Sequence, residues 1–256
     1  MRTKQYSSHV SVLTLFIVIL VMQSSQVRAD MQRWNFSLET GAVWQGYNDV
    51  QIPGDTGTPF SLSDLTGDGP IPFYRLELFY NLTKRQQLRF LIAPLDYTES
   101  GVFNEDVNFD GQNFAAGETT QATYQFNTFR ATYRYLFHDG PNWHWYVGGT
   151  LLLRDAEIAL KQGNVSASST DLGIVPLLNL YGDYRFANKW HFIVDFDGLA
   201  SPQGRAIDLG LKVNYDIDRH WSVGGGLRVV EGGADNDEVY NFAQFNYSLV
   251  SAGYRF

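Results

Sequence analysis

Apolar and polar residues alternate along most of this chain with a period of two. The clearest stretch runs from Ile207 to Ile217, where Ile, Leu, Val or Tyr occupies every second position and Asp, Gly, Lys or Asn lies between them. This period is typical of a β-strand with one apolar and one polar face, not of an α-helix. Ten such segments can be traced, at about residues 32–45, 71–82, 88–97, 124–137, 143–160, 172–186, 190–199, 205–217, 221–230 and 239–256. The pattern predicts an all-β chain.

The connections between the predicted strands alternate in length. Short turns follow every second strand, at 83–87, 138–142, 187–189 and 218–220. Two of the other loops, 47–70 and 98–120, are longer than 20 residues. Aromatic residues flank the short turns: Tyr80, Phe137, Trp143, Phe186, Trp190, Tyr215 and Trp221. These features are typical of barrels that cross an outer membrane. We therefore expect a single antiparallel transmembrane β-barrel of about ten strands, with short periplasmic turns and longer extracellular loops.

The chain ends on another alternating strand, in which Val250, Ala252, Tyr254 and Phe256 share one face. A terminal strand that ends in Tyr-x-Phe resembles the carboxyl-terminal signal of Gram-negative outer-membrane β-barrel proteins. The resemblance extends over residues 30–256 and is generic to that class. It implies that the barrel-assembly machinery reads Tyr254 and Phe256 as an assembly signal. It also implies that the outer surface meets outer-membrane lipid and lipopolysaccharide.

Two strands depart from simple alternation. In the strand at 88–97, Leu91 and Leu95 are apolar on the face that should be polar, and Pro94 cannot donate to a strand ladder. We expect a bulge or the end of a ladder there. In the last strand the apolar phase changes after residues 245–249, and a bulge near Ser248 is expected to reconcile the two phases.

The beginning of the chain has a different pattern. An apolar run at Val10–Met22 follows two basic residues, and Val27 and Ala29 supply the small residues of a cleavage site. This predicts a secretory signal peptide over 1–29, with 30–256 as the barrel. The apolar run is too short for a transmembrane helix. The predicted location is the cell outer membrane of a Gram-negative bacterium.

The composition and net charge of the chain limit the classes of molecule that it can bind. Removing the three basic residues of the signal peptide leaves 16 Lys and Arg against 27 Asp and Glu, a net charge of −11. So acidic a chain is a poor nucleic-acid binder. The chain contains no Cys, so it has no disulfide framework despite its predicted export.

Charged side chains occupy the strand faces opposite the apolar ones. The predicted lumen charge network consists of Arg75, Glu77, Arg130, Arg134, Arg154, Asp183, Arg185, Asp195, Asp208, Lys212 and Arg228. A barrel of this size has an interior nearly filled by side chains, and buried charges are tolerated only when they are paired. We expect a packed lumen, a structural or surface-interaction role, and no enzymatic activity. An outer-membrane hydrolase acting on lipid or peptide, or a narrow small-solute channel, is the alternative.

Two arrangements of residues could support catalysis. His220 and Ser222 resemble the His-x-Ser pair of outer-membrane phospholipases and lipid A deacylases, but here the pair opens a strand at a periplasmic turn. Asp195 and Asp197, with His144 or His191, resemble the acidic and His residues of outer-membrane proteases. Because these His residues lie near the periplasmic end and the aspartates do not, lumen salt bridges are expected instead.

The acidic loops at 64–68 and 235–238 could attract a divalent cation. Neither has the full ligand spacing of an EF-hand loop. The sequence predicts no catalytic residue, no metal site and no cofactor.

Overall fold

The computed structural model of the chain describes residues 33–256, so the predicted signal peptide lies outside the described residues. The strands are β1 (Trp34–Gln51), β2 (Phe60–Ser61), β3 (Ile71–Asn81), β4 (Gln86–Ala93), β5 (Asp96–Val102), β6 (Val107–Phe109), β7 (Gln112–Phe114), β8 (Thr119–Asp139), β9 (Trp143–Gln162), β10 (Val165–Ala187), β11 (Trp190–Ser201), β12 (Gly204–Asp216), β13 (Trp221–Asp235) and β14 (Tyr240–Arg255). A short helix, α2 (Leu62–Thr66), lies in the loop between β2 and β3. Within residues 33–256 no helix is long and apolar enough to cross a membrane.

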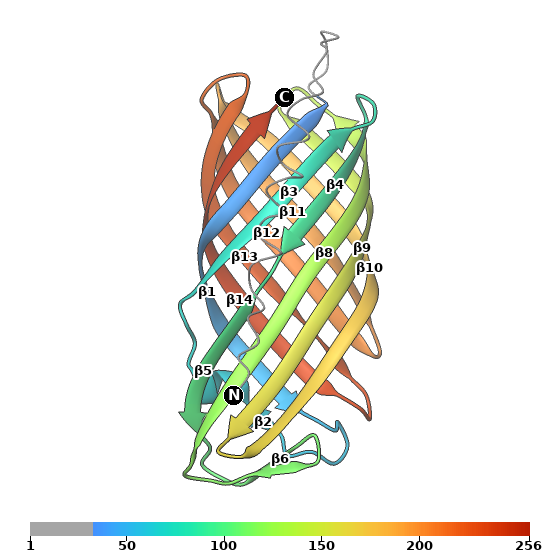
Figure 1. Cartoon of the computed structure of the whole chain (residues 1–256). Helices are drawn as coiled ribbons and strands as arrows, with labels where there is room; N and C mark the ends of the chain where they lie inside the picture. The colour runs from blue at the N-terminus through green and yellow to red at the C-terminus, as the bar shows by residue number, and fades with distance from the viewer. Residues whose placement is uncertain (1–32) are drawn as a thin grey trace, which may run out of the picture. The chain divides into compact units, whose positions relative to one another are not determined.

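The sheet closes on itself. β14 pairs antiparallel with β1, from Asn35 opposite Arg255 to Gln51 opposite Tyr240. β4 and β5 both pair with β8 and together form one position in the wall, interrupted at residues 94–95, where the sequence predicts the end of a ladder. The described residues therefore form a closed antiparallel barrel of ten wall strands, which confirms the predicted fold class (Figure 1).

The short-turn end lies at the top of Figure 1. It carries a ring of aromatic pairs. Each pair consists of residues directly opposite each other on neighbouring strands, with ring centroids 4.5 to 4.9 Å apart: Trp34 with Tyr80, Trp143 with Tyr184, Trp190 with Tyr215, and Trp221 with Tyr254. Trp190 and Trp221 remain more than 40% exposed on the outside of the barrel. A ring of this kind fits the boundary between lipid headgroups and hydrocarbon.

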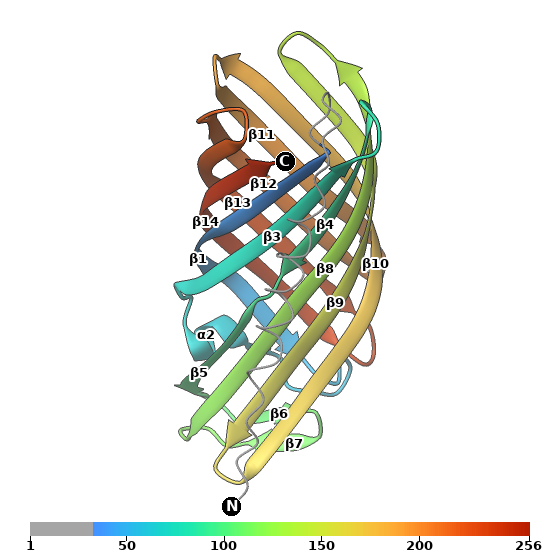
Figure 2. The same cartoon turned by 45° about the horizontal axis from the view of Figure 1, so that its top comes forward.

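The long-loop end has an apolar interior. We call this cluster of buried residues the outer core: Val43, Val50, Ile52, Leu62, Leu65, Ile71, Phe73, Leu95, Tyr97, Phe103, Val107, Phe109, Phe114, Ala122, Tyr124, Ile158, Leu160, Val230, Ala243, Phe245, Tyr247 and Leu249. Helix α2 and the β6–β7 hairpin lie at this end of the barrel (Figure 2). The helix begins at Ser61, whose hydroxyl accepts a hydrogen bond from the backbone N–H of Asp64 at 3.2 Å.

The outer core explains the phase change in the last strand, so the predicted bulge near Ser248 is wrong. β14 pairs with β13 in one unbroken register, and the shift against β1 lies on β1, between Gln45 and Tyr47. Alternate residues from Phe245 to Leu249 point inward and are buried in the outer core. Val250 and the residues that alternate with it point outward.

The break between the strands predicted at 143–160 and 172–186, which implies a loop at 162–171, is also wrong. β9 continues to Gln162 and β10 starts at Val165, joined by a tight turn in which Gly163 has a φ of +56°. Ser, Thr and Ala dominate the start of β10, so its strand pattern is weak in the sequence. Full-length pairing with β9 supplies the backbone hydrogen bonds and carries this hairpin beyond its neighbours on the β11 side (Figure 1).

Candidate functional site

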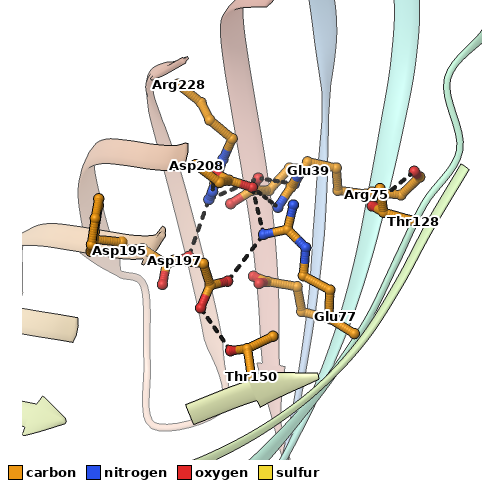
Figure 3. A network of polar contacts seen from close by, with 12 residues as sticks. Glu39, Arg75, Glu77, Thr128, Thr150, Asp195, Asp197, Asp208 and Arg228 are labelled. Atoms are coloured by element: carbon orange, nitrogen blue, oxygen red, sulfur yellow. Dashed lines mark hydrogen bonds and ion pairs between the residues drawn. The ribbon is translucent and has the colours of Figure 1, made fainter. Parts of the chain in front are cut away.

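Ten charged side chains meet inside the barrel. We call them the central charge layer: the acids Glu39, Glu77, Asp195, Asp197 and Asp208, and the bases Arg75, Arg89, Arg130, Lys212 and Arg228. Each residue is at most 7% exposed. They come from seven strands, β1, β3, β4, β8, β11, β12 and β13, and each occupies an inward position of its strand. Figure 3 shows how Glu39, Glu77 and Asp208, among others, meet inside the barrel. Five acids balance five bases, so the layer carries no net charge.

Arg89 joins three of the acids. Its Nη1 lies 3.1 Å from Asp195 and 3.6 Å from Glu77, and its Nη2 donates to Asp197. Nη2 also donates to the hydroxyl of Thr132 at 3.1 Å. A guanidinium presents several donors in one plane and can therefore satisfy several carboxylates at once.

Asp208 is the second centre of the layer. Arg130 Nη1 lies 2.7 Å from Asp208 and 3.0 Å from Asp197, and Arg75 Nη2 lies 3.3 Å from Asp208. Arg228 also donates to Asp208. Three guanidinium groups thus surround one carboxylate.

Glu39 forms the third centre of the layer. Lys212 donates to its Oε1, while Arg75 and Arg228 lie 3.4 and 3.6 Å from its Oε2. Glu39 Oε2 accepts no hydrogen bond among the described residues, so these two contacts are ion pairs without hydrogen-bond geometry.

Uncharged side chains satisfy the other carboxylate oxygen of Asp197, Oδ1. Thr150 donates to it at 2.7 Å and Asn179 donates at 2.9 Å. Thr150 also shares a hydrogen bond of 2.8 Å with Thr132, which in turn contacts Arg89. The layer is therefore a continuous polar network that crosses the barrel.

Seven of the eleven side chains in the predicted lumen network belong to this layer: Arg75, Glu77, Arg130, Asp195, Asp208, Lys212 and Arg228. Arg134, Asp183 and Arg185 lie on its short-turn side. Arg154 lies on its long-loop side, paired with Asp171.

The prediction omits Glu39, Arg89 and Asp197. Each directly follows an outward apolar residue, Leu38, Leu88 or Phe196, and this is the signal that could have identified them. Arg89, for example, lies between Leu88 and Phe90.

Arg134 is a cation outside the balanced layer. Its guanidinium lies over the ring of Tyr181, 4.1 Å from the centroid, and 5.2 Å from that of Phe79. Its Nε donates to Gln87 at 2.7 Å, whereas Nη1 has no hydrogen-bond partner among residues 33–256. Stacking on aromatic faces partly compensates a buried guanidinium.

Two cavities lie on opposite sides of the layer, each of about 300 Å³. The short-turn cavity is lined by Glu77, Asp195 and Lys212 from the layer, and by polar residues nearer the turns. The long-loop cavity is lined by Arg130 and Asp208 from the layer, and by apolar residues of the outer core. No residue of the central charge layer lines both cavities.

The residues considered for catalysis are not brought together. All four His residues of the described range lie toward the short-turn end: His138, His144, His191 and His220. His191 lies between Asp183 at 2.8 Å and Asp216 at 3.2 Å, whereas Asp195 and Asp197 contact Arg89.

The His220–Ser222 pair lies at the same rim. The His220 ring stacks on Tyr254 at 5.9 Å, and Ser222 lines the short-turn cavity. Tyr254, one of the two predicted signal residues, also contacts the rings of Trp221 and Phe256, each at 4.8 Å. Within residues 33–256 no group of three or more His, Asp or Glu is placed to hold a metal ion.

The chain shares its architecture with outer-membrane β-barrels of known structure. The outer-membrane protease OmpT of Escherichia coli superposes with a TM-score of 0.55 at 9% identity, covering 91% of this chain and 100% of that one. Ail, the attachment invasion locus protein of Yersinia pestis, superposes with a TM-score of 0.41 at 11% identity, covering 88% and 99%. Neisserial surface protein A gives a TM-score of 0.38 at 12% identity, covering 87% and 97%. No protein-family model matches the sequence, and no curated protein matches it. At these identities the likeness concerns the fold alone, and that fold is the outer-membrane β-barrel.

The comparison corrects one expectation. The sequence-based prediction that the chain is not an enzyme rested on its class, a small outer-membrane barrel with a packed lumen. A barrel of this architecture is a protease. Membership of the class therefore does not exclude catalysis, and the prediction is overturned.

Proposed function

We propose that residues 30–256 form a barrel in the outer membrane of a Gram-negative cell, closed to solutes at its centre, with a structural or surface-interaction role on the extracellular side. The single observation that carries the proposal is the central charge layer, ten paired and buried charges between two cavities. Separating these ions would leave buried charges unpaired, which is costly. The layer therefore favours a plug over a conducting path.

Planar-bilayer recording tests the closed lumen. The wild type is expected to show no steady conductance. The Arg130→Ala variant removes a side chain that contacts Asp197 and Asp208 and lines the long-loop cavity, so it should open a leak.

The matched control is Arg154→Ala, which lines the same cavity outside the layer and should stay closed. Steady, large conductance of the wild-type protein would contradict the proposal and favour a narrow channel.

We propose further that the barrel-assembly machinery inserts the chain and reads its terminal strand. Phe256 contacts Tyr254, and its backbone N–H bonds to the carbonyl of Trp34 at 2.9 Å. Deleting Phe256 removes both an end-strand bond and the proposed signal. It should reduce the amount of folded, heat-modifiable protein more than deletion of Asp235, the exposed last residue of β13. Equal amounts of folded protein from the two deletions would argue against this role.

A further inference from the structure

The barrel wall is incomplete on one side of the long-loop half. β10 pairs with β9 along its whole length, but with β11 only from Leu178 to Ala187. β11 ends at Ser201 and turns into β12 at Gly204. Among the described residues no strand pairs with the β11-facing edge of β10 between Val165 and Leu177. A gap therefore separates this free edge from the β11–β12 hairpin.

The long-loop cavity reaches both borders of this gap. It is lined by Val175 and Leu177 from the free edge and by Ala206 and Ile207 from β12. Deeper inside, apolar residues such as Val230 and Phe245 line one part of it, and Arg130 and Asp208 of the central charge layer line its inner end. The gap thus leads to a space inside the barrel that has an apolar wall and a charged inner end.

The outer border of the gap faces lipid. Leu172, Ile174 and Leu178, which point outward from β10, are 70%, 72% and 63% exposed. Exposed apolar side chains in a continuous row on a barrel wall mark the hydrocarbon layer. The part of the gap that is nearer the short-turn end is therefore at the level of the outer leaflet.

An unpaired strand edge cannot face hydrocarbon, because its N–H and C=O groups need hydrogen-bond partners. Such an edge is tolerated where it lines a cavity that supplies polar partners. Here the Arg154–Asp171 ion pair lies beside the edge. The gap therefore combines a polar border with an apolar interior, and a molecule that fills it must match both.

We propose that the long-loop cavity binds a single-chain amphipathic lipid, of the chemistry of a free fatty acid, which enters sideways from the outer leaflet through the gap between β10 and β12. The chain lies against Leu177, Val230 and Phe245, and the headgroup contacts the free edge and the Arg154–Asp171 pair. A cavity of about 300 Å³ is at the small end of ligand sites, which suits one acyl chain and excludes a multi-chain lipid. The inference rests on the proposed closed barrel, because the central charge layer ends the cavity and keeps the bound lipid from passing through the lumen.

The alternation of β10 provides a test with a built-in reference. The full mature barrel is placed in phosphatidylcholine vesicles that contain palmitic acid with a diazirine at the end of its chain. After illumination, mass spectrometry locates the adducts. The proposal expects adducts on the inward residue Leu177, and on Phe245 across the cavity. Adducts confined to the outward residues Leu172, Ile174 and Leu178 would overturn it.

Two adjacent substitutions separate entry through the gap from other routes. Val175→Trp fills the inner border of the gap and should abolish the adduct on Phe245. Ile174→Trp places the same side chain on the lipid face and should leave that adduct intact. Equal labelling of Phe245 in both variants would overturn sideways entry. Heat-modifiable migration checks that both barrels are folded, and Ala243→Trp, which fills the cavity from the opposite wall, provides a second blocking variant.

A second copy of the chain could instead cover the free edge. Because the chain has no Cys, a single Ser168→Cys variant reports on this arrangement. The proposal expects no interchain disulfide, and rapid disulfide formation would assign the edge to a dimer and overturn it. Conductance measured with the same preparations keeps the two proposals distinct, since an open pore contradicts the closed barrel whereas missing inner adducts contradict the lipid site.

Discussion

The central charge layer and the outer core are built from the same strands with opposite chemistry. At the level of the layer, apolar side chains such as Val147 point outward and charges such as Arg89 point inward. At the level of the outer core the arrangement is reversed, with Leu160 buried inside and Lys161 exposed outside. The difference shows that the medium around the barrel, and not the strand itself, decides which face is apolar. Water outside drives apolar residues into the interior, whereas lipid outside removes that driving force and leaves the interior to paired polar groups.

Strand β9 shows the transition within one element. Its outward residues change from Leu151 and Leu153 to Asp155 and Glu157 within four positions. Its inward residues change in the opposite sense, to Ile158 and Leu160. On this side of the barrel, the lipid-facing surface therefore ends close to residue 154 in the direction of the long loops.

The largest effect is expected in the central charge layer. Arg89→Ala removes the partner of three buried acids and should lower the free energy of unfolding by about 4 kcal/mol. The comparison is Arg205→Ala, which breaks an exposed pair with Glu231 and should cost at most about 1 kcal/mol. Urea unfolding of the two barrels in detergent micelles measures both values. Similar losses would mean that the layer does not depend on its pairing.

A slightly smaller loss is expected in the outer core. Leu160→Ala removes a fully buried apolar side chain and should cost about 3 kcal/mol. Lys161→Ala, one position along the same strand, changes an exposed side chain and should stay within about 0.5 kcal/mol of wild type. If the two substitutions cost the same, the interior at this level would not be a packed core.

Introducing an outward charge tests the lipid boundary on β9. Val147→Arg places a cation against hydrocarbon and should cost about 2 kcal/mol in phospholipid vesicles. Ala159→Arg makes a similar change beyond the boundary, beside Asp155 and Glu157, and should change stability by no more than about 0.5 kcal/mol. Equal costs would place both residues on the same side of the boundary.

The smallest effect is expected at an exposed turn, away from both regions. The Asp218 carboxylate accepts hydrogen bonds from the backbone N–H groups of Trp221 and His220, which lowers its pKa from the ordinary value of 3.8. Because the folded-state pKa is lowered, the carboxylate stabilises the fold above about pH 4, and this contribution is lost as the pH falls through the folded-state pKa.

The test is Asp218→Asn, which keeps an acceptor oxygen but not the charge. It should be slightly less stable than wild type at pH 7, and the difference should vanish in acid. A difference that persists at low pH would assign the effect to side-chain geometry instead of charge.

Sequence reasoning succeeded where lipid surrounds the barrel. The strand at 205–217 is readable because hydrocarbon outside requires every second residue to be apolar, while the layer inside requires polar residues between them. The same rule, applied to Leu88 and Phe90, would have placed Arg89 inside. The apolar inward residues Leu91 and Leu95 obscured this: Leu95 already belongs to the outer core, whereas Leu91 is a buried apolar residue opposite Glu77 and Arg130 of the layer.

Sequence reasoning failed beyond the lipid boundary. There, aromatic and aliphatic residues such as Phe245 and Tyr247 point inward, so the apolar phase shifts although the strand is continuous. The start of β10 failed for another reason, since its Ser, Thr and Ala residues form a strand through pairing with β9 and not through their own pattern. The gap beside β10 could not be predicted, because it depends on the lengths of two hairpins and not on any local pattern.

The pairing within the central charge layer also constrains the order of folding. Its contacts join residues far apart in the chain, with separations of 133 for Arg75 to Asp208 and 173 for Lys212 to Glu39. The members up to Arg130 comprise three bases and two acids, and those from Asp195 onward comprise three acids and two bases. Neither half of the chain can neutralise its own charges. Contacts of such high contact order form late and slow the folding reaction. The layer therefore contributes its stabilisation only once the strands of the two halves of the chain have met.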